Sequence, residues 1–120
     1  MSDGPRILIA EDEEFIIMLL EDILLDEGYR VMSANRLDDA LNMLETECFD
    51  AAILDINLRD APVFPLAVRL RELDVPFAFA TGGGSDAIPA QFKSYPILSK
   101  PYTAATFVEG VAALMVSAKS

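Results

Sequence analysis

Short apolar runs alternate with longer amphipathic segments along this chain, and this alternation limits the folds open to it. The apolar runs predict strands at residues 6–10, 29–33, 51–54, 77–80 and 96–98. Apolar residues recur at helical spacing in residues 14–27, 37–45, 65–73 and 103–118. Strands that are apolar throughout must be buried on both faces, which is typical of parallel sheets covered by helices on each side. We therefore predict an α/β doubly wound fold with a five-stranded parallel sheet.

The chain has the length and the apolar content of one domain. It has 120 residues, of which 52% are hydrophobic, and we expect a single domain over residues 1–120 with a core of about residues 6–118. In the first helix the apolar stripe is predicted at Phe15, Met18, Leu19, Ile23 and Leu24 or Leu25. Cys48, the only cysteine, excludes an internal disulfide and is expected in the core or at its boundary.

The charge of the chain excludes several classes of partner. The net charge is −11, so no basic patch is available for nucleic acid or for an anionic membrane surface. The longest apolar runs are too short to span a bilayer, and the N-terminus lacks the apolar segment of a signal peptide. These features predict a cytoplasmic protein that binds neither nucleic acid nor membranes. The chain also has no histidine, which removes the commonest general base and metal ligand.

Polar residues follow four of the five predicted strands. Ligands of doubly wound sheets bind outside the carboxyl ends of the strands, so these residues converge if their strands are neighbours. Three carboxylates brought together need a cation, and oxygen ligands without histidine or cysteine suit Mg²⁺, with Mn²⁺ or Ca²⁺ also possible. Glu13 and Glu14 are expected in the first turn of the next helix, where negative charge complements the helix dipole. The converging residues are Glu11, Asp12, Asp55, Thr81 and Lys100.

The whole chain resembles the receiver domain of two-component response regulators. The matching pieces are "ILIAEDEE", "AILDINL", "FATG" and "LSKPY", which occur in the family's order and at the corresponding strand ends. The resemblance implies the strand order 2-1-3-4-5 of flavodoxin-like and CheY-like folds. It also implies a Mg²⁺ site in which Asp12 and Asp55 are ligands, Glu11 acts through water, and the backbone carbonyl of Asn57 is a further ligand.

The resemblance also implies a phosphoryl site. Asp55 would be the phosphoacceptor, and Asn57 would flank the phosphoryl group. Thr81 and the backbone N–H of Gly82 would bind phosphoryl oxygens, and Lys100 would pair with another. The bond between Lys100 and the proline that follows resembles the cis peptide of the family.

Three departures from the commonest receivers concern the segment around the predicted fourth and fifth strands. Ile97 stands where the family usually has an aromatic switch residue, and three glycines follow Thr81. The link at residues 85–94 is short and contains Pro89, so we predict a fourth helix that is one turn long, distorted or mobile. These features resemble a subgroup with an F-A-T-G signature, often stand-alone receivers paired with histidine kinases of the HWE type. As a hypothesis, activation orders residues 82–94 around the phosphoryl group.

The resemblance implies a single-domain response regulator. It would accept a phosphoryl group from a histidine kinase onto Asp55 in a Mg²⁺-dependent reaction. It would then relay the group, act as a sink for it, or signal through contacts with a downstream phosphotransfer or target protein. It would not be an enzyme beyond its own phosphorylation and dephosphorylation. The final helix and the short fourth helix are the expected partner surface. A fragment of a longer protein would have the same sequence features.

Other classes remain as alternatives. A haloacid-dehalogenase-like phosphatase shares the aspartyl nucleophile, Thr, Lys and Mg²⁺, but it needs an acid two residues after the nucleophile, where this chain has Asn57. A nucleotide- or flavin-binding domain would place its phosphate loop after the first strand, where residues 11–14 repel phosphate. A pseudo-receiver would bind partners without phosphorylation, but the complete set of strand-end residues argues against it.

Overall fold

The fold is a single parallel sheet covered by helices on both faces. The computed structural model describes residues 4–83 and 86–119. Within these residues five parallel strands lie in the order β2-β1-β3-β4-β5, which confirms the predicted topology. The strands are β1 (Arg6–Ala10), β2 (Arg30–Ala34), β3 (Ala51–Asp55), β4 (Phe77–Thr81) and β5 (Ile97–Ser99).

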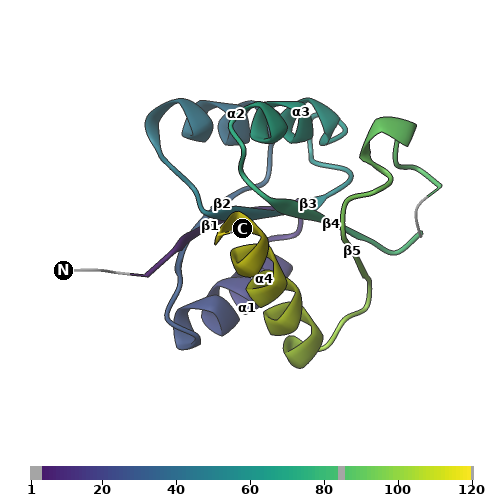
Figure 1. The fold of residues 1–120 in the computed structure, drawn as a ribbon. Coiled ribbons are helices and arrows are strands. Elements are labelled where there is room, and N and C mark those ends of the chain that lie inside the picture. Colours follow the sequence, from purple (N-terminus) through teal and green to yellow (C-terminus); the bar gives the residue numbers. More distant parts are fainter. Residues whose placement is uncertain (1–3, 84–85, 120) are drawn as a thin grey trace.

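Four α-helices cover this sheet, two on each face. Figure 1 shows α2 and α3 on one face and α1 and α4 on the other. No helix in the described ranges combines the length and the apolar content needed to cross a bilayer. The helices are α1 (Glu14–Asp26), α2 (Leu37–Thr46), α3 (Phe64–Glu72) and α4 (Ala104–Lys119).

The sheet divides the core into two apolar layers. Successive side chains of a strand point to opposite faces, so Leu8 and Ala10 of β1 pack in the α2/α3 layer, whereas Ile7 and Ile9 pack in the α1/α4 layer. The same alternation holds in β3 and β4. Burial on both sides explains why these strands are apolar throughout. Phe107, Val111 and Leu114 of the last helix complete the α1/α4 layer.

Two predictions about side-chain burial are wrong. Phe15, Met18 and Leu19 were expected on the buried face of α1, but they are 70%, 62% and 47% exposed. Because α1 is apolar around most of its circumference, helical spacing alone does not identify the face that contacts the sheet. Cys48 is exposed as well, since it lies in the connection between α2 and β3. The buried residues of α1 are Ile17, Leu20 and Leu24.

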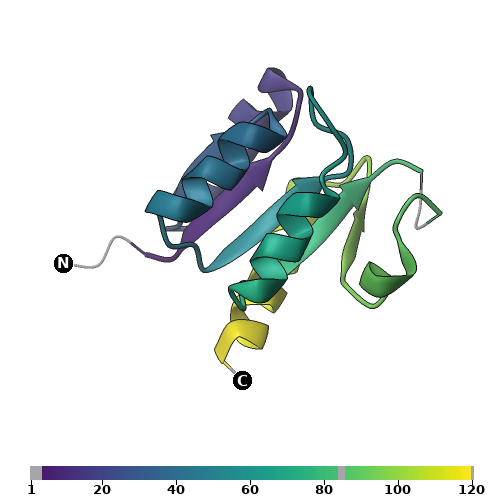
Figure 2. The ribbon, with the colours of Figure 1, turned by 90° about the horizontal axis from the view of Figure 1, so that it is seen from above.

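The connection between β4 and β5 contains one turn of 3₁₀-helix, η1 (Ala90–Phe92), and no α-helix in its described part. This confirms the prediction of a short fourth helix, and Gly84 and Ser85 of this connection lie outside the described residues. Pro89 precedes η1 with extended backbone angles, φ −59° and ψ 153°, which stops a longer helix from forming through this position. Figures 1 and 2 show the connection at the sheet edge formed by β4 and β5.

Aromatic packing fixes η1 to the core. Phe92 is fully buried, and its ring centroid lies 5.9 Å from that of Phe79 and 6.1 Å from that of Phe77. The guanidinium of Arg71 lies 4.9 Å from the centroid of the Phe92 ring. Phe92 therefore supplies the attachment that a longer amphipathic helix would otherwise provide.

We predict that Phe92→Ala lowers the free energy of unfolding by roughly 3–5 kcal/mol, because it removes a buried ring and leaves a cavity. Phe15→Ala is a matched control, since the same truncation at a 70% exposed side chain should change stability by less than about 1 kcal/mol. Urea unfolding of the two variants checks this. Equal, small effects would show that the β4–β5 connection is not anchored through Phe92.

Candidate functional site

Three carboxylates meet at the carboxyl ends of β1 and β3. Glu11 and Asp12 directly follow β1, and Asp55 is the last residue of the adjacent strand β3. One oxygen atom from each of the three side chains lies within 4.8 Å of the other two. Glu11 is only 2% exposed, and its backbone N–H donates to the Ala34 carbonyl, which extends the pairing of β1 with β2. Parallel pairing thus brings together acids that lie more than forty residues apart.

Lys100 follows β5 and places its ammonium between two of these acids. Its Nζ donates to Oε1 of Glu11 at 3.1 Å and to Oδ2 of Asp55 at 3.2 Å. Its backbone N–H donates to the Thr81 carbonyl at 2.8 Å, which holds the residue beside the end of β4. The peptide bond between Lys100 and Pro101 is cis, as predicted.

The charges of this site are only partly balanced. Burial, followed by the negative charge of Asp55, raises the pKa of Glu11 from 4.5 to about 7, although the Lys100 hydrogen bond opposes the shift. Burial on its own would lower the pKa of Lys100, but the hydrogen bond and charge of Glu11, together with Asp55, raise it above its ordinary value. Lys100 therefore stays charged, and its ammonium is paired with two of the three carboxyl groups, those of Glu11 and Asp55.

The donor set fits a hard divalent cation. All the available ligand atoms are oxygens, three of them carboxylate oxygens within 4.8 Å of one another. Asn57 is exposed in the loop after β3, and the two backbone bonds that close this loop, Val63 N–H to Ile56 and Leu58 N–H to Ala61, do not use the Asn57 carbonyl. A cation here would offset the charge that Lys100 leaves unbalanced.

The end of β4 forms the neighbouring wall of the site. Thr81 is 9% exposed, and its Oγ1 accepts a hydrogen bond from the Gly83 N–H at 3.1 Å. A Cβ atom added at Gly82 would meet only the Cβ of Lys100, at an ordinary contact distance of 3.9 Å. The space at Gly82 therefore does not depend on the absence of a side chain. All the predicted strand-end residues lie at this one edge of the sheet.

Sequence reasoning missed one cation at this edge. Arg59 lies in the loop between β3 and α3, and its Nε donates to the backbone carbonyl of Asp12 at 3.3 Å. Its Nη2 lies 3.9 Å from a carboxylate oxygen of Glu14. The available signal was that Arg59 carries the one positive charge in the "DINLRDAP" segment.

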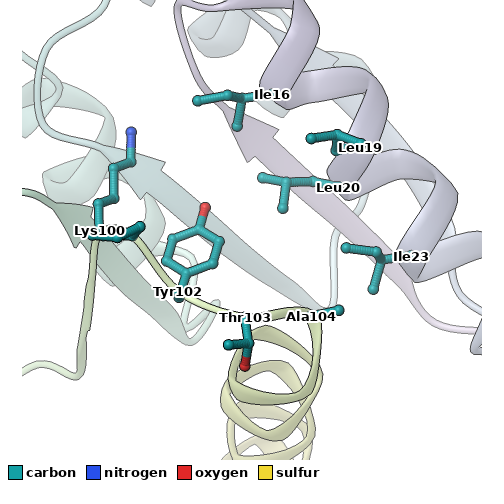
Figure 3. A pocket seen from close by; sticks show the side chains of 9 residues that line it. Ile16, Leu19, Leu20, Ile23, Lys100, Tyr102, Thr103 and Ala104 are labelled. Atoms are coloured by element: carbon teal, nitrogen blue, oxygen red, sulfur yellow. The ribbon is translucent and has the colours of Figure 1, made fainter.

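An apolar groove adjoins the site between α1 and the start of α4. It has a volume of about 550 Å³, and Lys100 lies at one end of it (Figure 3). Tyr102 stacks on Phe107, with 5.7 Å between ring centroids, and its hydroxyl is buried with no hydrogen-bond partner in the part of the chain that the structure describes. Burial raises the pKa of this hydroxyl. The lining residues on α1 are Ile16, Leu19, Leu20 and Ile23.

In metal-free protein, we predict that the unfolding free energy falls as pH rises from about 4.5 to about 7, because folded Glu11 holds its proton more tightly than unfolded Glu11. The stabilisation from the Glu11 proton is fully present below the pKa of Glu11 in the unfolded chain, 4.5, and is lost above its pKa in the folded protein, about 7. It amounts to roughly 3 kcal/mol at most, at about 1.4 kcal/mol per pKa unit. Glu11→Gln removes it. Urea unfolding over this pH range compares wild type, Glu11→Gln and the exposed-site control Glu27→Gln. Parallel profiles for all three would contradict the prediction.

Comparison with known structures places the geometry in context. The solution structure of SdrG from Sphingomonas melonis Fr1 is 41% identical, covers 96% of this chain and 99% of its own, and superimposes with a TM-score of 0.79. The chemotaxis response regulator CheY4 of Vibrio cholerae is 22% identical, with a TM-score of 0.82 over 92% of this chain and 98% of its own, and this likeness shows the fold alone.

Sequence comparison identifies the family. The transcriptional regulatory protein DltR of Streptococcus agalactiae is 36% identical over 78 residues, which are 63% of this chain and 35% of DltR. The chain thus spans about a third of the length of this relative. The sequence model of the response regulator receiver domain matches residues 7–112. With its 2-1-3-4-5 sheet and its acidic strand ends, the chain therefore belongs to the response regulator receiver domain family.

Proposed function

We propose that this receiver domain accepts a phosphoryl group on Asp55 and acts as a single-domain response regulator. One observation carries the proposal: Lys100 donates to both Glu11 and Asp55, with Asp12 within the same cluster. This arrangement leaves Asp55 next to an ammonium and next to ligands for a divalent cation. A phosphoryl group requires positive charge on both sides when it is transferred to a carboxylate.

In the proposed reaction, an Asp55 carboxylate oxygen attacks the phosphorus of a phosphohistidine on a sensor kinase. The P–N bond breaks, and the histidine nitrogen keeps the electron pair. Asp12 and Asp55, Glu11 through water, and the Asn57 carbonyl would hold Mg²⁺, or Mn²⁺ or Ca²⁺ in its place. Bound metal supplies positive charge to the phosphoryl oxygens.

The remaining contacts of the phosphoryl group come from β4 and β5. Lys100 would exchange its bond to Asp55 for a bond to a phosphoryl oxygen. The Thr81 hydroxyl and the Gly82 N–H would donate to the others. Attack of water on the aspartyl phosphate then returns the site to its starting state. One phosphoryl group passes through each chain in this way, and we propose no other enzymatic turnover.

We propose a cytoplasmic histidine kinase of the HWE type as the donor, and a phosphotransfer or target protein as the recipient. A phosphohistidine must reach Asp55, so the donor's docking surface must border the site. Leu19, an exposed apolar residue of α1, lines the groove that ends at Lys100 and therefore meets this requirement. This position favours α1 and the start of α4 as the docking surface for the donor. The surface expected from the sequence was the final helix, α4, together with the short helix η1.

The activation hypothesis concerns residues 82–94. Ile88 is 2% exposed and Phe92 is fully buried, so this far part of the segment is already packed in the core. Gly82 and Gly83 are exposed beside Thr81. We propose that the phosphoryl group acts on the part nearest Thr81, since this part has few core contacts to lose.

An amide NMR titration tests the proposed function. We expect Mg²⁺ to shift residues around Glu11, Asp12 and Asp55. Beryllofluoride, a mimic of the acyl phosphate, should then shift the residues next to Thr81 in wild type but not in Asp55→Asn. The variant preserves the shape of the side chain and removes the nucleophilic charge. If neither ligand produces specific shifts, the domain is a pseudo-receiver and the proposal fails.

A second experiment tests the docking surface. The donor is an HWE histidine kinase that phosphorylates the wild type. We expect Leu19→Glu to slow phosphoryl transfer from this kinase by about tenfold, because the substitution places a charge in an apolar contact. Labelling by the small donor acetyl phosphate should stay within about twofold, since that donor needs no docking surface. Leu73→Glu, at a similarly exposed leucine on the end of α3, is the control. Equal slowing by both variants would argue against docking on α1.

A further inference from the structure

Arg59 is held in a well-defined place at the edge of the carboxylate site. Its backbone N–H donates to the Asn35 carbonyl at 3.1 Å, which ties it to the end of β2. The next residue, Asp60, accepts hydrogen bonds from the Leu37 and Asp38 N–H groups at the start of α2, at 2.6 and 3.3 Å. The loop that carries Arg59 is therefore fastened to two neighbouring elements.

The side chain of Arg59 is fixed at its base and open at its tip. Nε donates to the Asp12 carbonyl at 3.3 Å, and Nη2 makes only a long ion pair with Glu14, at 3.9 Å. The side chain is 51% exposed. A guanidinium has five N–H donors in a rigid fork, so most of the donors of Arg59 face solvent. The guanidinium of Arg59 is therefore already held beside Asp12, a residue of the carboxylate cluster.

Arg59 is an exposed cation on a rim that is otherwise rich in acids. Lys100 is already engaged with Glu11 and Asp55 inside the site, with its side chain only 24% exposed. The acids that follow β1 make the rim negative, and the chain carries a net charge of −11. The acids of this rim repel an anionic group that leaves the site, whereas the exposed guanidinium of Arg59 beside the Asp12 carbonyl can pair with it. Arginine binds carboxylates through two parallel hydrogen bonds better than any other side chain.

We infer that Arg59 accelerates phosphorylation of Asp55 by small phosphodonors whose leaving group is a carboxylate, that is, acyl phosphates. This inference rests on the proposed function. Asp55 attacks phosphorus in line, so the leaving group departs on the side away from Asp55, toward the rim. With acetyl phosphate, an Asp55 oxygen bonds to phosphorus, the P–O bond to the acetyl group breaks, and acetate leaves with the electron pair. Arg59 stabilises the negative charge that develops on this acetate.

A donor with a nitrogen leaving group provides the internal comparison. With phosphoramidate, the same attack on phosphorus breaks the P–N bond, and the already protonated nitrogen leaves as neutral ammonia. No carboxylate forms, so Arg59 has no charge to stabilise. The phosphoryl group, Asp55, Lys100 and the metal ligands are the same for both donors. A difference between the donors therefore reports on the leaving group alone.

The experiment measures the rate of Asp55 phosphorylation with acetyl phosphate and with phosphoramidate, at saturating Mg²⁺ and equal ionic strength. We expect Arg59→Gln to lower the acetyl phosphate rate by about tenfold, the scale of one charge-assisted hydrogen bond, and to change the phosphoramidate rate by less than about twofold. Arg59→Lys should recover part of the loss. Arg69→Gln, which removes a positive charge from the surface of α3, should affect neither rate.

The outcomes separate this inference from the proposed function. An equal fall with both donors overturns it, because Arg59 would then act on the shared phosphoryl or metal site. Unchanged rates with both donors also overturn it. If neither donor labels wild-type Asp55, the proposed function itself fails and the inference fails with it. If both donors label wild-type Asp55, the phosphoacceptor role of Asp55 stands whatever Arg59 does.

Discussion

The hydrogen bonds from Lys100 to Glu11 and Asp55 are the interaction on which the rest of the site depends. Two acids at the ends of neighbouring strands repel each other, and burial strengthens that repulsion. One ammonium offsets part of it: burial, followed by the charge of Asp55, raises the pKa of Glu11 to about 7, and Lys100 opposes this shift only in part. The folded domain thus keeps three carboxyl groups beside a single ammonium. A divalent cation or a phosphoryl group with its counter-ion would change that balance of charge, and the proposed function uses both.

The strands, the helices and the positions of most site residues could be predicted from local periodicity, whereas the strand order that brings these residues together came from the resemblance to receiver domains. Apolar runs identify the strands, and the residue after each strand must lie at the carboxyl edge of a parallel sheet. Asp55, Thr81 and Lys100 are therefore located once the strands are. Their roles in chemistry came from resemblance, since position alone does not distinguish a nucleophile from a metal ligand.

The remaining features depend on contacts between distant segments, which periodicity does not contain. The exposed face of α1 is set by which side meets the sheet and α4, and α1 has apolar residues on several sides. The contact of Arg59 with the Asp12 carbonyl joins two loops that are far apart in sequence. The buried hydroxyl of Tyr102 likewise depends on the approach of α1 to the chain after β5. None of these could be read from a single segment.

The two core layers have a consequence for how such a domain can change during evolution. The groove beside α1 lies over one layer, which contains Ile7 and Ile9, whereas Phe92 and the β4–β5 connection belong to the other, which contains Leu8 and Ala10. Because the sheet separates the layers, a substitution in one layer alters the packing of that layer most directly. The surface proposed to receive the phosphoryl donor and the segment proposed to respond to the phosphoryl group can therefore diverge independently. Lineages with new partners can arise while the strand-end chemistry between the layers stays the same.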